Sequence, residues 1–196
     1  MTRFILATLF ITGLTFAGKA HNVDQGTLKV NATDSKVEWT ARKVTGKHTG
    51  TVKIKNGQVE INDGILTKAT VTMDMTSIAN SDLSGQYKTK LEGHLRSDDF
   101  FFFYKFPTAS LKTTTVVAKS EGDYRITADL TIRGITHPIT FDAQVVPDGN
   151  KYRAMANLVV DRTLYDVKYG SGKFFDDLGD TTIYDDFDLA ISLVIE

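Results

Sequence analysis

The feature that most constrains the fold is a long stretch of alternating residues, DYRITADLTIRGITHPITFDAQVV at 123–146. Its apolar positions are Tyr124, Ile126, Ala128, Leu130 and Ile132, then Ile139, Phe141, Ala143 and Val145. Because successive side chains of a strand point to opposite faces, this pattern predicts two strands with one apolar face each. Gly134 tolerates backbone conformations that other residues avoid. Pro138 has no backbone N–H to donate within a sheet, which suits the start of a strand, so the two residues indicate a corner between the strands. The stretch therefore predicts an antiparallel hairpin whose dry face needs further strands.

Further segments show the same alternation. They lie at 37–41, 52–54, 59–61, 69–75, 109–120, 152–160 and 183–195. Asn56-Gly57 is the strongest short hairpin signal and predicts a turn between two of these strands. The segment 44–50, with its two glycines, predicts a bend or bulge rather than a clean turn, and 62–64 predicts a second turn.

One segment has a helical period instead. Tyr87, Leu91 and Leu95 are spaced by four, which predicts a short amphipathic helix over 84–96 with Ser84 as a candidate N-cap. The run FFFFY at 100–104 follows, and four consecutive phenylalanines cannot alternate between the two faces of one sheet. We expect the helix and this run to pack together as a lid or plug over one end of the sheet structure.

These segments predict an all-β fold, an antiparallel β-barrel of about eight strands with one short α-helix. A two-sheet sandwich is the alternative. An outer-membrane barrel would also alternate, with apolar residues facing lipid, but the helix and the phenylalanine run argue against it.

The N-terminus has the layout of a secretory signal peptide over 1–20. Arg3 precedes an apolar run at 4–16, and cleavage is expected after Ala17 or Ala20. A retained membrane anchor is the alternative, but the run is short for a span. We therefore expect a periplasmic or secreted protein that does not span a membrane after signal removal.

Charge and cysteine content exclude several function classes. The chain has 23 basic and 24 acidic residues, and removing Arg3 and Lys19 leaves 21 against 24. With no basic tract left, nucleic acid is not an expected partner. The absence of cysteine excludes disulfides, thiolate metal sites and cysteine nucleophiles.

Several motifs taken in order resemble one family. They are SKVEWTARKVTGKHTGTVKIKNGQV, KLEGHLRSDDFFFFYKFPTASL, DLTIRGITHPITF, VVDRTLYDVKYGSG and DDFDLAISLVI. Together they resemble the YceI-like family of secreted bacterial proteins, and the resemblance covers nearly all of 21–196. It implies a lipocalin-like barrel whose interior holds a long-chain isoprenoid or similar amphiphilic lipid. It also implies no shared catalytic residues, and it makes a homodimer plausible.

Nothing in the sequence requires catalysis, a cofactor or a metal. The four histidines are isolated and match no metal spacing. GSGK at 170–173 lacks the earlier glycine of a phosphate loop and has Phe174 where Ser or Thr is needed. No serine lies in a nucleophile-elbow context.

Large side chains predicted to face the interior are the candidate ligand contacts. They are Trp39, Met73, Met75, Phe101, Phe103, Tyr124, Phe141 and Tyr152. His48, Tyr165 and Tyr169 are candidates near a polar end. The same alternation would describe a filled core, so two alternatives stay open: a structural or interaction barrel, and an enzyme using the cavity on a lipid or quinone-like substrate.

Overall fold

The computed structural model describes residues 26–196, and the signal peptide expected at 1–20 lies outside them. The strands are β1 (Gly26–Lys29), β2 (Lys36–Lys43), β3 (Gly46–Asn62), β4 (Ile65–Asn80), β5 (Thr108–Ser120), β6 (Asp123–Ile132), β7 (Ile135–Asp148), β8 (Lys151–Asp161) and β9 (Ile183–Ile195). The helices are α1 (Gly85–Arg96) and the 3-10 turns η1 (Arg162–Tyr165) and η2 (Gly179–Thr181).

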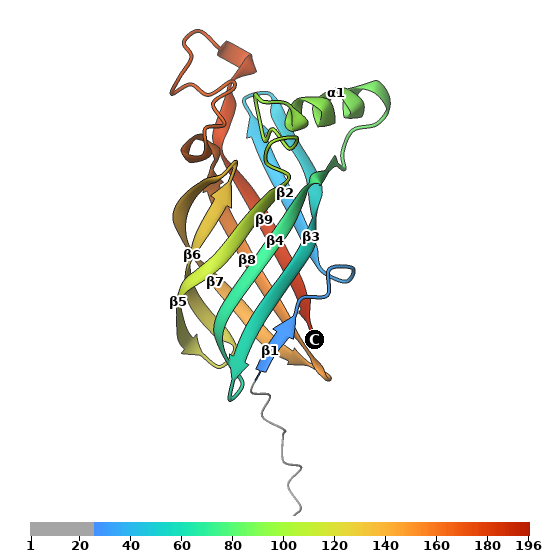
Figure 1. Cartoon of the computed structure of the whole chain (residues 1–196). Helices are drawn as coiled ribbons and strands as arrows, with labels where there is room; N and C mark the ends of the chain where they lie inside the picture. The colour runs from blue at the N-terminus through green and yellow to red at the C-terminus, as the bar shows by residue number, and fades with distance from the viewer. Residues whose placement is uncertain (1–25) are drawn as a thin grey trace, which may run out of the picture.

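The strands form one closed antiparallel barrel (Figure 1). The ladder runs β3-β2-β9-β8-β7-β6-β5-β4, and β4 pairs back onto β3. Closure leaves no exposed sheet edge among these eight strands. The predicted all-β, lipocalin-like barrel with one short helix is thus confirmed.

The ninth strand, β1, completes the wall beside the far half of β3. Gly26 to Lys29 pair with Ile61 to Gln58, whereas β2 pairs with the other half of β3. Lys29 and Glu196 exchange backbone hydrogen bonds of 2.7 and 2.8 Å. Hence β1 and β2 lie one after the other between β3 and β9, with β2 beside one half of β3 and β1 beside the other half.

The two ends of the barrel differ. One, called here the helix end, carries α1, the loop 97–107 and the segment 162–182 (Figure 1). The other, the turn end, carries the tight turns at 63–64, 121–122 and 149–150.

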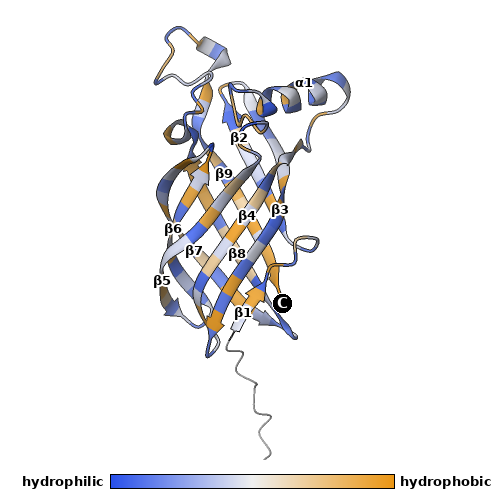
Figure 2. Ribbon diagram, viewed as in Figure 1, coloured by the Kyte–Doolittle hydropathy of each residue, from blue (hydrophilic) through white to orange (hydrophobic). Residues whose placement is uncertain are grey.

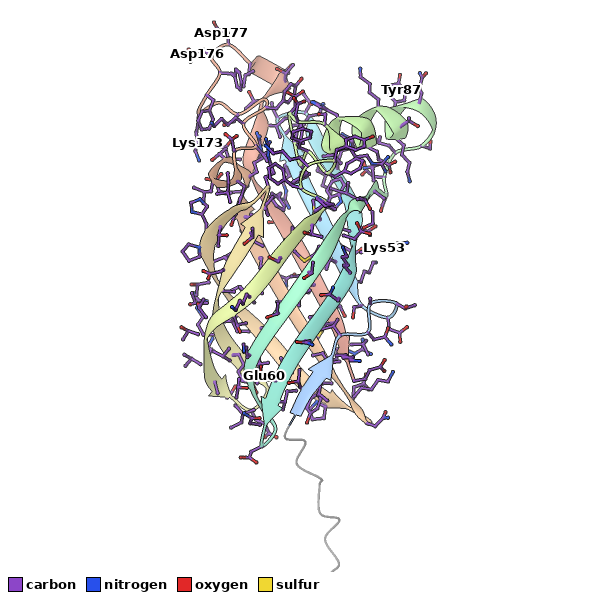
Figure 3. The ribbon with its side chains drawn as sticks, viewed as in Figure 1. Lys53, Glu60, Tyr87, Lys173, Asp176 and Asp177 are labelled. Carbon is purple, nitrogen blue, oxygen red and sulfur yellow. The ribbon has the colours of Figure 1, made fainter. Side chains whose placement is uncertain are left out.

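Alternation along the strands separates the interior from the surface (Figure 2). The apolar residues of β6 that the sequence singled out are all buried, with Ala128 completely inaccessible. On β3, Lys53 and Glu60 project from the outer surface (Figure 3). The hairpin predicted at 123–146 is confirmed as β6 and β7, turning at Arg133 and Gly134.

The turn predicted at Asn56-Gly57 is wrong, because β3 continues through it. The register against β4 shifts between Ile54 and Asn56, which is a β-bulge. Gly57 faces inward, where a Cβ would lie 2.6 Å from Cγ2 of Val30. The glycine therefore permits close packing and does not make a turn.

The segment 44–50, predicted as a bend or bulge, contains a tight turn instead. The chain reverses at Val44 and Thr45, and β2 pairs with β3 in unbroken register from Gly46 onward. Gly50 lies inside β3, opposite Trp39. The turn at 62–64 is confirmed.

The predicted helix is confirmed, one residue shorter at its start. Ser84 occupies the N-cap position, but its side chain makes no capping hydrogen bond. After α1, the amide of Phe101 bonds the carbonyl of Leu95 at 3.1 Å, which folds the phenylalanine run back under the helix. Leu95 and Phe100 are both buried in the core.

Candidate ligand-binding interior

The barrel encloses two apolar cavities, one toward each end. The upper cavity, of about 90 Å³, reaches Leu95 and Phe100 at the helix end. The lower, of about 80 Å³, reaches Leu66 and Ile195 near the turn end. Both walls present only apolar atoms.

A waist separates the two cavities. Its residues, which line both, are Val37, Met73, Leu130 and Leu189. Each cavity is smaller than the roughly 150 Å³ that accommodates benzene in a protein core. An unbranched thioether such as Met73 adapts its rotamer readily, so the waist is the part of the interior best able to change shape.

Five of the predicted ligand contacts line these cavities. Trp39, Met75 and Phe101 line the upper one, Phe141 the lower one, and Met73 both. The indole N–H of Trp39 is buried without a hydrogen-bond partner. The interior thus brings together side chains from β2, β4, β7 and the loop after α1.

The other aromatic candidates lie beside the cavities. Phe103 and Tyr152 are partly buried against the core, and Phe103 stacks on Tyr104 with ring centroids 4.2 Å apart. The hydroxyl of buried Tyr124 accepts a 3.1 Å hydrogen bond from the amide of Leu66.

Tyr165 closes a seam in the wall. The ladder between β7 and β8 spans only 143–148 and 151–156, and η1 packs beside β7 above it. The ring of Tyr165 meets His137 edge-on at 5.4 Å. Burial, aided by nearby Asp161, raises the pKa of the Tyr165 hydroxyl to about 12.

Sequence reasoning missed several cavity residues. Val37 lies on the same strand face as Trp39, and Leu130 on the same face as Tyr124, so the alternation of apolar residues could have identified both. Arg162, Ile183 and Tyr184 line the upper cavity from the segment that leaves and re-enters the barrel, and no pattern marked Arg162.

Arg133 holds the helix end together. Its Nη1 lies 3.0, 2.6 and 3.1 Å from the carbonyl oxygens of Asp98, Phe100 and Asp166. Tyr169 packs on the same loops, with ring centroids 4.4 Å from His94 and 5.8 Å from Phe100. The loop after α1 and the segment after β8 therefore form one cover over the upper cavity.

A polar network seats α1 on β4. The side-chain Nδ2 of buried Asn80 donates to the carbonyl of Thr49 and to Asp82. The backbone N–H of Asn80 donates to Glu92 of α1 at 2.9 Å. His48 Nδ1 lies 2.8 Å from Asp82 Oδ2. His48, a predicted ligand contact, is thus paired with Asp82 and lines neither cavity.

Asp82 is held in its ionised form. Burial alone would raise the pKa of this carboxyl, but hydrogen bonds from the Thr49 amide, His48 and Asn80 outweigh it. The result is a pKa lowered from 3.8 to about 2.

A stability measurement across acid pH tests this network. Since the folded pKa of Asp82 lies below its unfolded value, the carboxylate stabilises the fold fully above about pH 4, and this is lost as pH falls toward 2. We expect Asp82→Asn to remove about 1 to 2 kcal/mol of that pH-dependent unfolding free energy, measured by urea denaturation at pH 6 and pH 2.5. Asp98→Asn, at an exposed carboxylate of the same end, is the control. An identical pH dependence in wild type and Asp82→Asn would contradict the assignment.

Among residues 26–196, no helix is long and apolar enough to cross a membrane. In the same range no three His, Asp or Glu side chains are grouped so that they could hold a metal ion.

Comparisons with known sequences identify relatives. A UPF0312 protein of Shewanella denitrificans is 34% identical over 97 residues, which is 50% of this chain and 42% of the relative. Protein YceI of Escherichia coli is 37% identical over 84 residues, or 42% of this chain and 40% of the relative. The matched part thus spans about two fifths of these relatives' length.

Solved structures show the same fold. Burkholderia cenocepacia BcnA superposes with a TM-score of 0.70 at 21% identity, over 84% of this chain and 98% of its own. A polyisoprenoid binding domain from Saccharophagus degradans, implicated in plant cell wall breakdown, gives 0.64 at 16% identity, over 86% and 97%. The model of the YceI-like domain matches residues 28–195, and the chain therefore belongs to the YceI-like domain family.

Proposed function

We propose that this protein is a periplasmic or secreted carrier that holds a long-chain isoprenoid or similar amphiphilic lipid along the barrel axis. The observation that carries the proposal is the pair of apolar cavities that lie on either side of one waist. Family membership and the fold shared with a polyisoprenoid binding domain support binding over catalysis. The signal-like segment 1–20 supports export.

An apolar wall is sufficient for such a ligand. Each buried CH₂ contributes roughly 0.8 kcal/mol, so a chain of many carbons needs no polar anchor. We propose Trp39, Met73, Met75, Phe101 and Phe141 as the chain contacts. Because the cavities are small, uptake requires the waist to open, which the side chain of Met73 allows.

The polar head group of the amphiphile belongs at the helix end. There, Phe100 lines the upper cavity, and the ring of Tyr169 lies 5.8 Å from the ring of Phe100. A homodimer is part of the same proposal and is tested by sedimentation.

The first experiment uses Trp39 as reporter. It is the single tryptophan and lines the upper cavity, so its fluorescence responds to an occupant. Delipidated protein is titrated with geranylgeraniol, and native mass spectrometry measures the stoichiometry. We expect a saturable fluorescence change and a one-to-one complex. A bare polypeptide mass with no fluorescence change would favour the filled-barrel alternative.

Filling the upper cavity should abolish this binding. Ala41 lines that cavity, and Ala41→Leu adds a branched side chain where the ligand would lie. We expect its affinity for geranylgeraniol to fall by at least about tenfold. The matched control is Ala118→Leu, which adds the same atoms at an exposed position near the end of β5 that lines neither cavity. Equal affinities for the two variants would contradict an interior site.

A further inference from the structure

The exposed aromatic side chains are confined to one end of the barrel. Among residues 26–196, six large aromatic residues are exposed: Tyr87, Tyr104, Tyr169, Phe174, Phe175 and Tyr184. All six come from α1, the loop 97–107 or the segment 162–186, and Tyr104 is 82% exposed. We call this set the aromatic rim. Figure 3 shows Tyr87 and the tip at Asp176 and Asp177 on this helix end.

Apart from Tyr184 at the start of β9, the described barrel strands carry no exposed aromatic residue. The other exposed large apolar side chains of these strands are aliphatic and include Val117 and Val159. Scattered aliphatic residues are normal on a soluble protein, whereas gathered aromatic ones mark interaction sites. Tyrosine is enriched at membrane interfaces because its ring has an apolar body and a polar end, and phenylalanine is among the residues that interfacial segments bury at the boundary with the acyl chains.

The rim is held in place by contacts to neighbouring charges and rings. Lys168 Nζ lies 5.3 Å above the Phe174 ring, and Tyr104 stacks on Phe103. Arg133 ties the two loops that carry Tyr104 and Tyr169, as described above. These contacts fix Tyr104, Tyr169 and Phe174 on the cover of the helix end.

Charge at this end is balanced. Segment 42–49 has three basic residues and no acidic one, 81–107 has four of each, and 162–186 has three basic and six acidic. With Arg133 of the β6–β7 turn, the end carries eleven basic and ten acidic residues. Several of its lysines are paired locally, as in the 3.2 Å pair of Lys173 with Asp185. Taken as a whole, the end has almost no net charge to attract a polyanion, an acidic protein or an anionic membrane.

The rim is continuous with the interior. Tyr184 is 50% exposed yet also lines the upper cavity, together with its neighbour Ile183. On the outer side, the same two residues border a groove beside Lys173 and Asp185. The start of β9 is therefore the wall between the apolar interior and the aromatic surface.

We propose that the helix end docks on the surface of a zwitterionic lipid bilayer, with the aromatic rim in the head-group region and the upper cavity above the lipid. The rings supply the apolar contact, and the balanced charge matches a surface without net charge. This inference deepens the proposed carrier function, since docking places the cavity where a membrane lipid enters or leaves.

Vesicle flotation tests the docking. The chain is recovered after export by the producing cell, its N-terminus is determined by mass spectrometry, and it is mixed with phosphatidylcholine vesicles. We expect the double variant Phe174→Ser/Phe175→Ser to bind the vesicles at least about tenfold more weakly than wild type. Val117→Ser/Val159→Ser, which removes two exposed aliphatic side chains from the wall, is the control and should stay within about twofold.

Several outcomes would overturn the docking. They are absence of wild-type flotation, equal losses in both double variants, and binding that strengthens tenfold when phosphatidylglycerol replaces phosphatidylcholine. A dimer that dissociates in Phe174→Ser/Phe175→Ser while vesicle binding is unchanged would assign the rim to a second copy instead.

Geranylgeraniol titration of the same variants separates the two proposals. Lost vesicle binding with intact geranylgeraniol affinity supports docking by the rim. Flotation that depends on the rim in a protein that takes up no geranylgeraniol would overturn the carrier function and leave the docking standing. Geranylgeraniol uptake without flotation would overturn the docking and leave the carrier function standing.

Discussion

Gly50→Ala is expected to lower the free energy of unfolding by about 3 kcal/mol or more. A Cβ at this position would lie 2.0 Å from the carbonyl oxygen of Ala79 and 2.3 Å from Cζ2 of Trp39. The first neighbour is backbone of the paired strand β4, and the second is a ring fixed in the core, so neither gives way cheaply. The measurement is urea denaturation followed by circular dichroism.

Gly93→Ala is the matched control for this prediction. Gly93 lies inside α1, and a Cβ there meets nothing within 4 Å. We expect this substitution to stabilise the protein by about 0.5 to 1 kcal/mol, because alanine costs less backbone entropy in a helix. A Gly50→Ala protein within 1 kcal/mol of wild type would show that the indole does not pack against this backbone.

Alternation predicted most of the fold because the strands point alternate side chains into the apolar interior of the barrel. From 123 to 146 each apolar residue faced inward as its position required, and the period change at 84–96 located α1. These patterns are local consequences of burial, so one segment is sufficient to read them.

The error at Asn56-Gly57 shows where local reading fails. Buried residues are even-numbered up to Ile54 and odd-numbered from Gly57, and a hairpin or a bulge can each produce such a change of phase. The deciding contacts come from Val30 and β4, which are remote in sequence. Tertiary packing therefore overrode a strong turn signal.

The candidate site was predictable only in part for a related reason. Alternation says that Met73 and Phe141 point inward, but not that space remains beside them. Arg133 and Arg162 could not be recognised at all. Their partners are backbone carbonyls of loops and of the start of β9, which leave no trace in the residue types.

Arg162→Met is the second substitution expected to have a large effect. Arg162 is only 4% exposed, and its guanidinium donates to the carbonyls of Tyr184, Val167 and Ile183 at 3.1, 2.8 and 3.0 Å. Methionine keeps an apolar stem beside the upper cavity, but it leaves these carbonyls without their buried donor and removes the positive charge 3.7 Å from Asp185. We expect a loss of about 3 to 5 kcal/mol in the free energy of unfolding.

The same substitution should open the interior to solvent, because Arg162 fixes both the cover after β8 and the start of β9. Amides of 166–185 are expected to exchange hydrogen faster than those of β6, and bound geranylgeraniol should dissociate faster than from wild type. Lys173→Met is the control: its ammonium also pairs with Asp185, at 3.2 Å, but from an exposed position, so the loss should be far smaller than for Arg162→Met. If the two variants were equally stable and kept ligand equally well, the buried guanidinium would not be what seals the helix end.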